Sequence, residues 1–108
     1  MMTAQDRYEQ ITEELSKFGY NVSTKYSKEA KYIQFVRKVF KGQDTHIVAL
    51  ENHKDDFDEP KDWLIFSYLT NSTRDYWGHW IDEPYALEQK ELKLFDSLID
   101  VIEELYPS

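Results

Sequence analysis

Three histidines are the first residues to test for chemistry, because imidazole serves both as a metal ligand and as a general base near neutral pH. No pair among His46, His53 and His79 has the spacing of a zinc-binding motif such as H-E-x-x-H. Asp55 and Asp82 stand near them in the sequence without completing a ligand pattern. We therefore expect no metal ion and no cofactor, and we interpret the histidines as ordinary surface or strand residues.

Nucleophilic catalysis needs a hydroxyl or thiol beside a base, and no such pattern stands in this chain. Cysteine is absent, which excludes thiolate chemistry and disulfides. Ser67 lies inside an apolar run without the glycines of a nucleophile elbow, and His79 is near Asp75 and Asp82 only in sequence. The three glycines are scattered and form no phosphate-binding loop. We expect a protein that is not an enzyme.

An acidic segment at residues 51–62 supplies many carboxylate oxygens, notably from Asp55, Asp56, Asp58 and Glu59. It lacks the alternating acids, the turn glycine and the distal glutamate of a calcium-binding loop. We interpret it as an exposed loop whose carboxylates are available to a partner.

Aromatic residues concentrate between Trp63 and Tyr85, a stretch that holds all three tryptophans. Its second part surrounds Gly78 in a polar context, so not all of its aromatic side chains are expected to face inward. Exposed tryptophan and tyrosine often anchor protein interfaces. A lid over the sheet is the structural alternative. We predict a partner-binding surface made of this part and the nearby acids: Tyr76, Trp77, His79, Trp80, Asp82, Glu83, Asp55, Asp56, Asp58 and Glu59.

The net charge of −8 is unevenly distributed. Residues 1–50 carry eight bases and six acids, whereas residues 51–108 carry five bases and fifteen acids, which gives +2 and −10. The −10 of the second half would repel a phosphate backbone, so we expect no direct binding of nucleic acid. We interpret the bases of the first half as a sheet edge protected against aggregation: Lys25, Lys28, Lys31, Arg37, Lys38 and Lys41.

Three acids near the end of the last predicted helix, Asp100, Glu103 and Glu104, oppose the helix dipole. An unfavourable interaction with the helix dipole that no evident gain offsets indicates a functional surface. Our leading hypothesis is a small acidic regulator or inhibitor that acts by protein–protein contact. The first alternative is a nucleic-acid-mimicking inhibitor of a DNA-binding protein or nuclease, of the phage or mobile-element type. The second is a small-molecule binder or enzyme with a pocket near His79.

The element pattern predicts a single α+β domain over residues 1–108. Thr3 caps a helix at 4–18 with an apolar stripe at helical spacing, and Gly19 ends it. Strands of a meander follow, the first near an edge and the fourth central: 20–26, 32–40, 45–50, 63–70 and a short irregular strand at 75–81. We place the start of the last helix at Asp82–Pro84, with Pro84 in its first turn, and its end at Pro107.

This pattern gives an antiparallel sheet of four or five strands with both helices packed on the same face. The strands have apolar residues on both sides, so we expect a homodimer through the uncovered face. The sequence shows no secretion signal and no long apolar run, from which we expect a cytoplasmic protein without membrane contact. Its usage of lysine, glutamate and tyrosine is typical of bacterial or phage accessory proteins.

Overall fold

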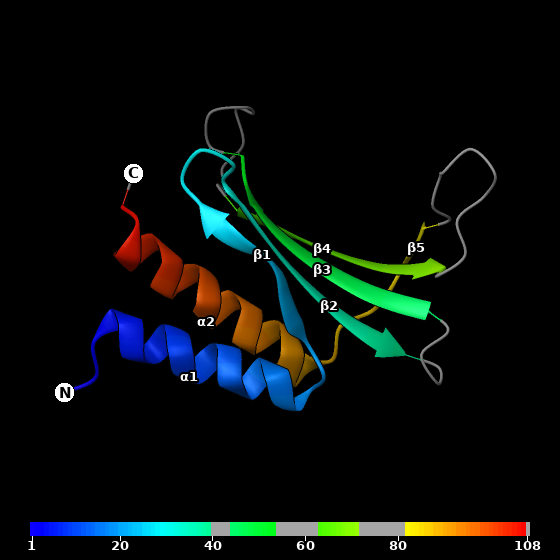
Figure 1. Ribbon diagram of the computed structural model, residues 1–108, viewed down its shortest axis with the longest axis horizontal. Coiled ribbons are helices and arrows are strands. Elements are labelled where there is room, and N and C mark those ends of the chain that lie inside the picture. The colour runs from blue at the N-terminus through cyan, green and yellow to red at the C-terminus, as the bar shows by residue number, and fades with distance from the viewer. Residues whose placement is uncertain (40–43, 54–62, 72–81, 108) are drawn as a thin grey trace.

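Two helices cover one face of an antiparallel sheet (Figure 1). The computed structural model describes residues 1–39, 44–53, 63–71 and 82–107. Within them lie α1 (Ala4–Lys17), β1 (Asn21–Ser27), β2 (Tyr32–Val39), β3 (Asp44–Asn52), β4 (Trp63–Asn71), β5 (Asp82–Pro84) and α2 (Gln89–Leu105). The strands follow one another in the order β1-β2-β3-β4-β5, which is a meander. The predicted α+β class and its helix–meander–helix arrangement are confirmed. Neither described helix has the length and apolarity that crossing a membrane requires.

Local signals define α1 as the sequence predicts. The Thr3 hydroxyl accepts a hydrogen bond from the Asp6 amide at 3.1 Å, and the Thr3 amide donates to the Asp6 carboxylate at 3.2 Å. This reciprocal capping box satisfies amides that the first helical turn leaves unpaired. Leu15 from the apolar stripe is fully buried. The chain then leaves the helix through Gly19, whose φ of +93° lies in the left-handed region.

Replacing Gly19 by alanine is expected to lower the free energy of unfolding by about 1–2 kcal/mol, because a Cβ atom is disfavoured at positive φ. Asparagine tolerates that region better, so Gly19→Asn is expected to cost less. Space is not the cause, since an added Cβ would meet Arg37 at an ordinary 3.8 Å. Urea denaturation of the two variants and the parent checks the order. Equal stability of all three would contradict it.

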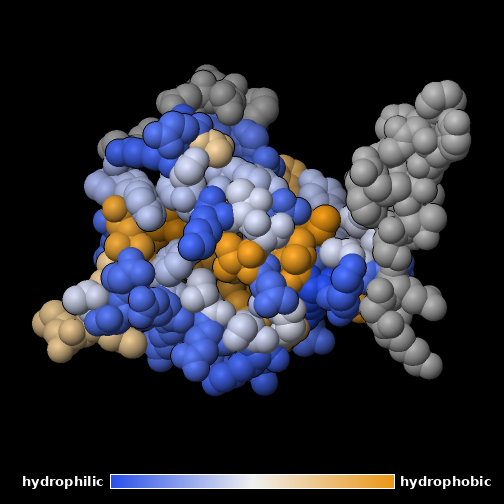
Figure 2. Space-filling model, in the orientation of Figure 1, coloured by the Kyte–Doolittle hydropathy of each residue, from blue (hydrophilic) through white to orange (hydrophobic). Residues whose placement is uncertain are grey.

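The core lies between the sheet and the helices. Antiparallel pairing places Phe35 of β2 beside Val48 of β3 and Ile33 beside Leu50, with all four side chains on the helix-facing side and buried. Phe95 of α2 meets Phe35 edge-to-face, with ring centroids 5.5 Å apart. In the view of Figure 2, the most strongly apolar surface gathers in a band between the helices and the sheet. Burial of these side chains is the main force that holds the two layers together.

The opposite face of the sheet is not covered by either helix (Figure 1). It carries Val36, Ile47, Phe66 and Tyr68, all partly buried, and the rings of Phe66 and Tyr68 are stacked with centroids 6.0 Å apart. The uncovered apolar face on which the expected homodimer depends is therefore present. The dimer itself stays a prediction.

Two predictions near β4 are wrong, one about where a loop begins and one about which strand is central. The acidic loop was expected to begin at Glu51, but β3 continues through Asn52, because Asn52 pairs with Trp63 and its amide donates to the Lys31 carbonyl at 2.9 Å. The run beginning at Trp63 was expected to be the central strand, but β3 has that place in the order. β5 pairs only with residues 68–70 of β4. The first half of β4 is thus an edge within the described sheet.

The predicted helix start at Asp82–Pro84 is also wrong, because these residues form β5. Pro84 lies opposite Tyr68, and the next amide, that of Tyr85, donates to the Ser67 carbonyl at 3.0 Å. In an antiparallel ladder, hydrogen-bonded and non-bonded pairs alternate, so Pro84 occupies a position where no amide is needed. The helix begins later, at Gln89. The predicted strand at 75–81 lies outside the described residues.

Candidate functional site

Most of the predicted partner-binding residues lie outside the described part of the chain. Asp82 and Glu83 are in β5, where their backbone pairs with Thr70 and Leu69 of β4. The remaining residues fall in segments 54–62 and 72–81, which lie outside the described residues: Tyr76, Trp77, His79, Trp80, Asp55, Asp56, Asp58 and Glu59. The predicted aromatic surface and the pocket near His79 therefore stay predictions.

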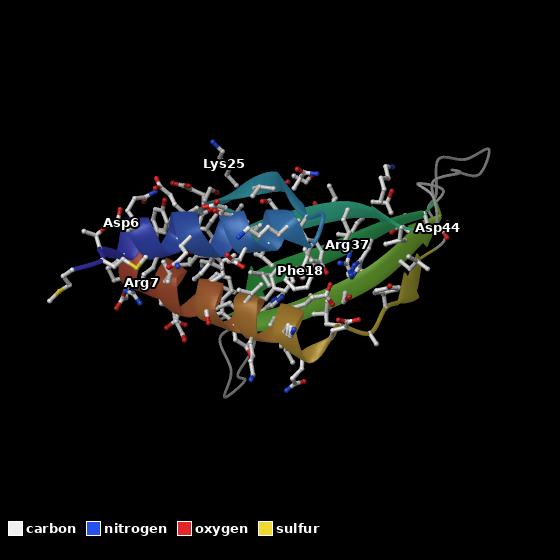
Figure 3. The ribbon with its side chains drawn as sticks, turned by 90° about the horizontal axis from the view of Figure 1, so that it is seen from below. Asp6, Arg7, Phe18, Lys25, Arg37 and Asp44 are labelled. Atoms are coloured by element: carbon white, nitrogen blue, oxygen red, sulfur yellow. The ribbon has the colours of Figure 1, made fainter. Side chains whose placement is uncertain are left out.

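The structure brings together a buried polar cluster that sequence reasoning missed. Strand pairing places Arg37 beside His46, and Arg37 forms an ion pair with Glu91 from the first turn of α2. Tyr20 and Ser67 complete the cluster. His46 is 0% exposed and Glu91 is 2% exposed. Figure 3 shows Arg37 at the end of the helical layer where α1 ends and α2 begins.

Arg37 is the hub of this cluster. Its guanidinium lies 2.6 Å from the Glu91 carboxylate, donates to His46 Nδ1 at 2.9 Å, and donates to the Phe18 carbonyl at 3.1 Å. It also stacks over the Tyr20 ring, 4.3 Å from the centroid. The Phe18 carbonyl is one of those that the end of α1 leaves without a helical partner. Arg37 thus joins α1, the sheet and α2, and its assignment to a basic surface edge was wrong.

The hydrogen bonds of His46 decide whether the cluster can act as a nucleophilic site. Because Nδ1 accepts from Arg37, the neutral ring carries its proton on Nε2, which lies 2.8 Å from Ser67 Oγ and donates to it. A serine nucleophile needs the opposite, an Nε2 that accepts the hydroxyl proton while Nδ1–H donates to a carboxylate. Ser67 is therefore not activated, and this pair does not form a catalytic dyad.

Electrostatics support the neutral imidazole. Burial, reinforced by the adjacent Arg37 charge and opposed by Glu91, lowers the pKa of His46 from 6.5 to about 4. Burial also raises the pKa of Tyr20, whose hydroxyl donates to Glu91 at 3.0 Å. The Tyr85 ring lies against His46, with centroids 4.3 Å apart. The arrangement has one fixed hydrogen-bond pattern and fastens the first turn of α2 to the sheet. We interpret the cluster as structural.

The described residues contain a second feature, a groove of about 610 Å³ between the edge of β4 and α2. Its walls come from only these two elements: Trp63, Leu64, Ile65, Leu92, Asp96, Ile99, Asp100 and Glu103. Seen from the helical side, α2 runs beneath the β4 side of the sheet and α1 beneath the β1 side (Figure 3). The groove therefore lies along the edge that β5 leaves unpaired. A partner can reach backbone, apolar side chains and carboxylates there together.

Three groove residues form an acidic row on α2. Asp96, Asp100 and Glu103 stand at spacings of four and three, which places exposed carboxylates on one side of the helix. In the part of the chain that the structure describes, they form no ion pair, whereas the adjacent Glu104 pairs with Arg7 of α1. The last turn of α2 contains no basic residue. Glu103 therefore stands in the last turn without a compensating base, as predicted, and the acidic row continues back along the helix to Asp96, which lies outside that turn.

Trp63, the first residue of β4, is one of the residues that line the groove. Its ring lies 5.8 Å from that of Tyr26, which in turn lies 5.1 Å from that of Tyr106. Tyr106 follows the end of α2 and lies near the start of β4, whereas Tyr85 precedes α2 and bonds to Ser67 further along that strand. The helix therefore runs antiparallel to β4. The Trp63 indole nitrogen is buried without a hydrogen-bond partner among the described residues.

The fold and the groove define the class of protein: a two-layer α+β protein with a helix–meander–helix order and an acidic cleft at one sheet edge. A comparison with protein-family models, with curated proteins and with solved structures finds no match for the chain.

Proposed function

We propose that this chain is a non-enzymatic protein-binding module, a regulator or inhibitor that acts by occupying a segment of another protein. The groove between β4 and α2 receives that segment, which carries lysine or arginine beside apolar residues. The observation that supports the proposal most is the acidic row along an apolar groove floor, which has no ion-pair partner within the described part of the chain. The predicted aromatic surface around Trp77 and Trp80 supplies a second contact to the same partner.

The chemistry of the groove fits long basic side chains. Leu92 and Ile99 offer apolar surface to the methylene stem of a lysine or arginine, while Asp96 and Asp100 stand where the charged end would emerge. Such side chains bury their stems and keep their charge at a polar rim. Carboxylates that face one another along a helix repel, at about 0.2–0.5 kcal/mol per pair. A bound cation would relieve that repulsion.

Reversing two charges of the acidic row tests the proposal. The probe is a short synthetic peptide of alternating lysine and valine, with binding measured by calorimetry. The double variant Asp96→Lys/Asp100→Lys is expected to bind it at least about tenfold more weakly, because attraction at the groove becomes repulsion. The matched control, Glu9→Lys/Glu13→Lys, makes the same change of charge at the same spacing on exposed positions of α1. Equal weakening in both double variants would refute the groove as the site.

A second candidate function is mimicry of nucleic acid, which the same acidic row favours because its carboxylates stand in line on a helix. A partner that normally binds a phosphate backbone would be captured through many charge contacts. Its complex would weaken steeply with added salt and be displaced by duplex DNA. A complex that involves the apolar groove floor depends less on salt and is not displaced by DNA.

A further inference from the structure

We propose that the bound segment adds to the sheet as an extra strand along the free edge of β4. This inference rests on the proposed function, and it specifies how the partner is held. Main-chain hydrogen bonds to a sheet edge supply affinity that does not depend on sequence, while alternate side chains supply selectivity. The occupant is an extended segment of another protein with lysine or arginine at alternate positions.

The ladder shows which backbone groups of β4 face the free edge. Ser67 directs its carbonyl toward β5, since that carbonyl accepts from the Tyr85 amide at 3.0 Å. The backbone groups of a strand alternate in direction with a period of two. β4 pairs with β3 without a register shift from Trp63 to Asn71. The amide and carbonyl of Ile65, and those of Trp63, therefore point to the same side as Ser67, whereas those of Leu64 point to β3.

Among the described residues, pairing along this edge ends at Ser67. β5 pairs with residues 68–70, Tyr85 bonds to Ser67, and the chain then leads into α2. No described residue pairs with β4 at Trp63–Phe66 on the side away from β3. An open edge next to a groove is the usual place at which an extended peptide extends a sheet.

Charge decides what occupies the edge. In an added strand, alternate side chains would point toward α2 and lie over Leu92 and Ile99, next to the carboxylates of Asp96 and Asp100. Basic residues at those positions complement the acidic row. A second copy of this chain, paired edge to edge, would bring two acidic rows together. The row thus discourages self-association at an edge that would otherwise invite it, and it selects a basic partner.

Amide hydrogen exchange tests the strand addition directly. In the free protein, the amide of Ile65 is expected to exchange quickly, while that of Leu64, bonded to β3, exchanges slowly. Saturation with the lysine–valine peptide is expected to slow exchange at Ile65 at least about tenfold and to leave Leu64 nearly unchanged. Slow exchange at Ile65 in the free protein would show that the edge is already occupied and would overturn the inference.

Backbone-modified peptides give the second arm. Methylation of the peptide amides at alternate positions is expected to weaken binding by about tenfold where the amide faces β4, because a backbone hydrogen bond is lost. Methylation at the intervening positions is expected to have little effect. The peptide could bind and be weakened by Asp96→Lys/Asp100→Lys, yet show no difference between methylated positions and no slowed exchange at Ile65. That result would refute strand addition and leave the proposed function standing. Absence of any peptide binding would refute both strand addition and the proposed function. If the free protein is a dimer in light scattering and its Ile65 amide exchanges slowly, the edge is occupied by a second copy of the chain.

Discussion

Replacing Arg37 by methionine is expected to lower the free energy of unfolding at neutral pH by about 3–5 kcal/mol, because it leaves a buried carboxylate without its cation. Glu91 is 2% exposed, and its carboxylate lies 2.6 Å from the Arg37 guanidinium. After the substitution its remaining hydrogen bonds come from the Tyr20 hydroxyl and the Glu88 amide. These neutral donors do not replace a full charge. Urea denaturation followed by circular dichroism measures the loss.

Two further variants separate a missing partner from lost packing. The double variant Arg37→Met/Glu91→Met is expected to be more stable than Arg37→Met alone, because it removes both buried charges. Arg7→Met is the control, since Arg7 pairs with Glu104 where both side chains are well exposed, and it is expected to cost less than about 1 kcal/mol. A cost for Arg37→Met as small as for Arg7→Met would contradict the buried ion pair.

Short-range patterns predicted most of the architecture. The helix at 4–18 has a capping threonine, an apolar stripe at helical spacing and a glycine at its end, and all three signals act within one segment. The strands were placed by alternation of apolar residues, which follows directly from the geometry of a half-buried sheet. Their antiparallel order followed from the short connections. Each of these features depends on neighbours in sequence, so one sequence sufficed.

The errors occur where a distant partner overrides the local pattern. Pro84 after two acids is a common helix start, but hydrogen bonding to β4 draws Asp82–Pro84 into the sheet. Arg37 was grouped with surface bases, because nothing near it in sequence reveals that Glu91 meets it across the core. One signal was available: His46 alternates with Val48 and Leu50, which places its imidazole on the buried face of the strand. A buried histidine requires polar partners, and their identity is set by tertiary contacts.

The sequence indicated only part of the groove. The conflict of Glu103 with the helix dipole drew attention to the helix that forms one of its walls, because that signal depends only on helix position. Asp96 escaped notice, since an acid in the middle of a helix breaks no local rule. The apolar floor of the groove was invisible in the sequence, because Ile65 and Leu92 become neighbours only when α2 packs beneath β4. The predicted contacts around Trp77 remain to be tested by substitution.

The stability of the protein is expected to fall as the pH is lowered from 6.5 to about 4, with His46 as one identifiable cause. Its pKa is about 4 in the folded protein and near 6.5 in the unfolded chain. Between these values the unfolded chain binds a proton that the folded protein does not, so acid favours unfolding. The difference amounts to about 3 kcal/mol below pH 4. Burial of the imidazole is the main cause of the lowered pKa, and a proton on Nδ1 would in addition face the Arg37 donor at 2.9 Å.

Comparison with His46→Gln isolates this contribution from that of the carboxylates. Glutamine supplies one amide oxygen and one amide donor for Arg37 and Ser67 without a titrating group. The variant is expected to be less stable than the parent at neutral pH, but to lose less stability on acidification. Its stability should therefore approach that of the parent as the pH nears 4. The measurement is urea denaturation of both proteins across this range. Two curves that stay parallel would show that His46 does not titrate on unfolding, and the neutral, buried imidazole would then have to be abandoned.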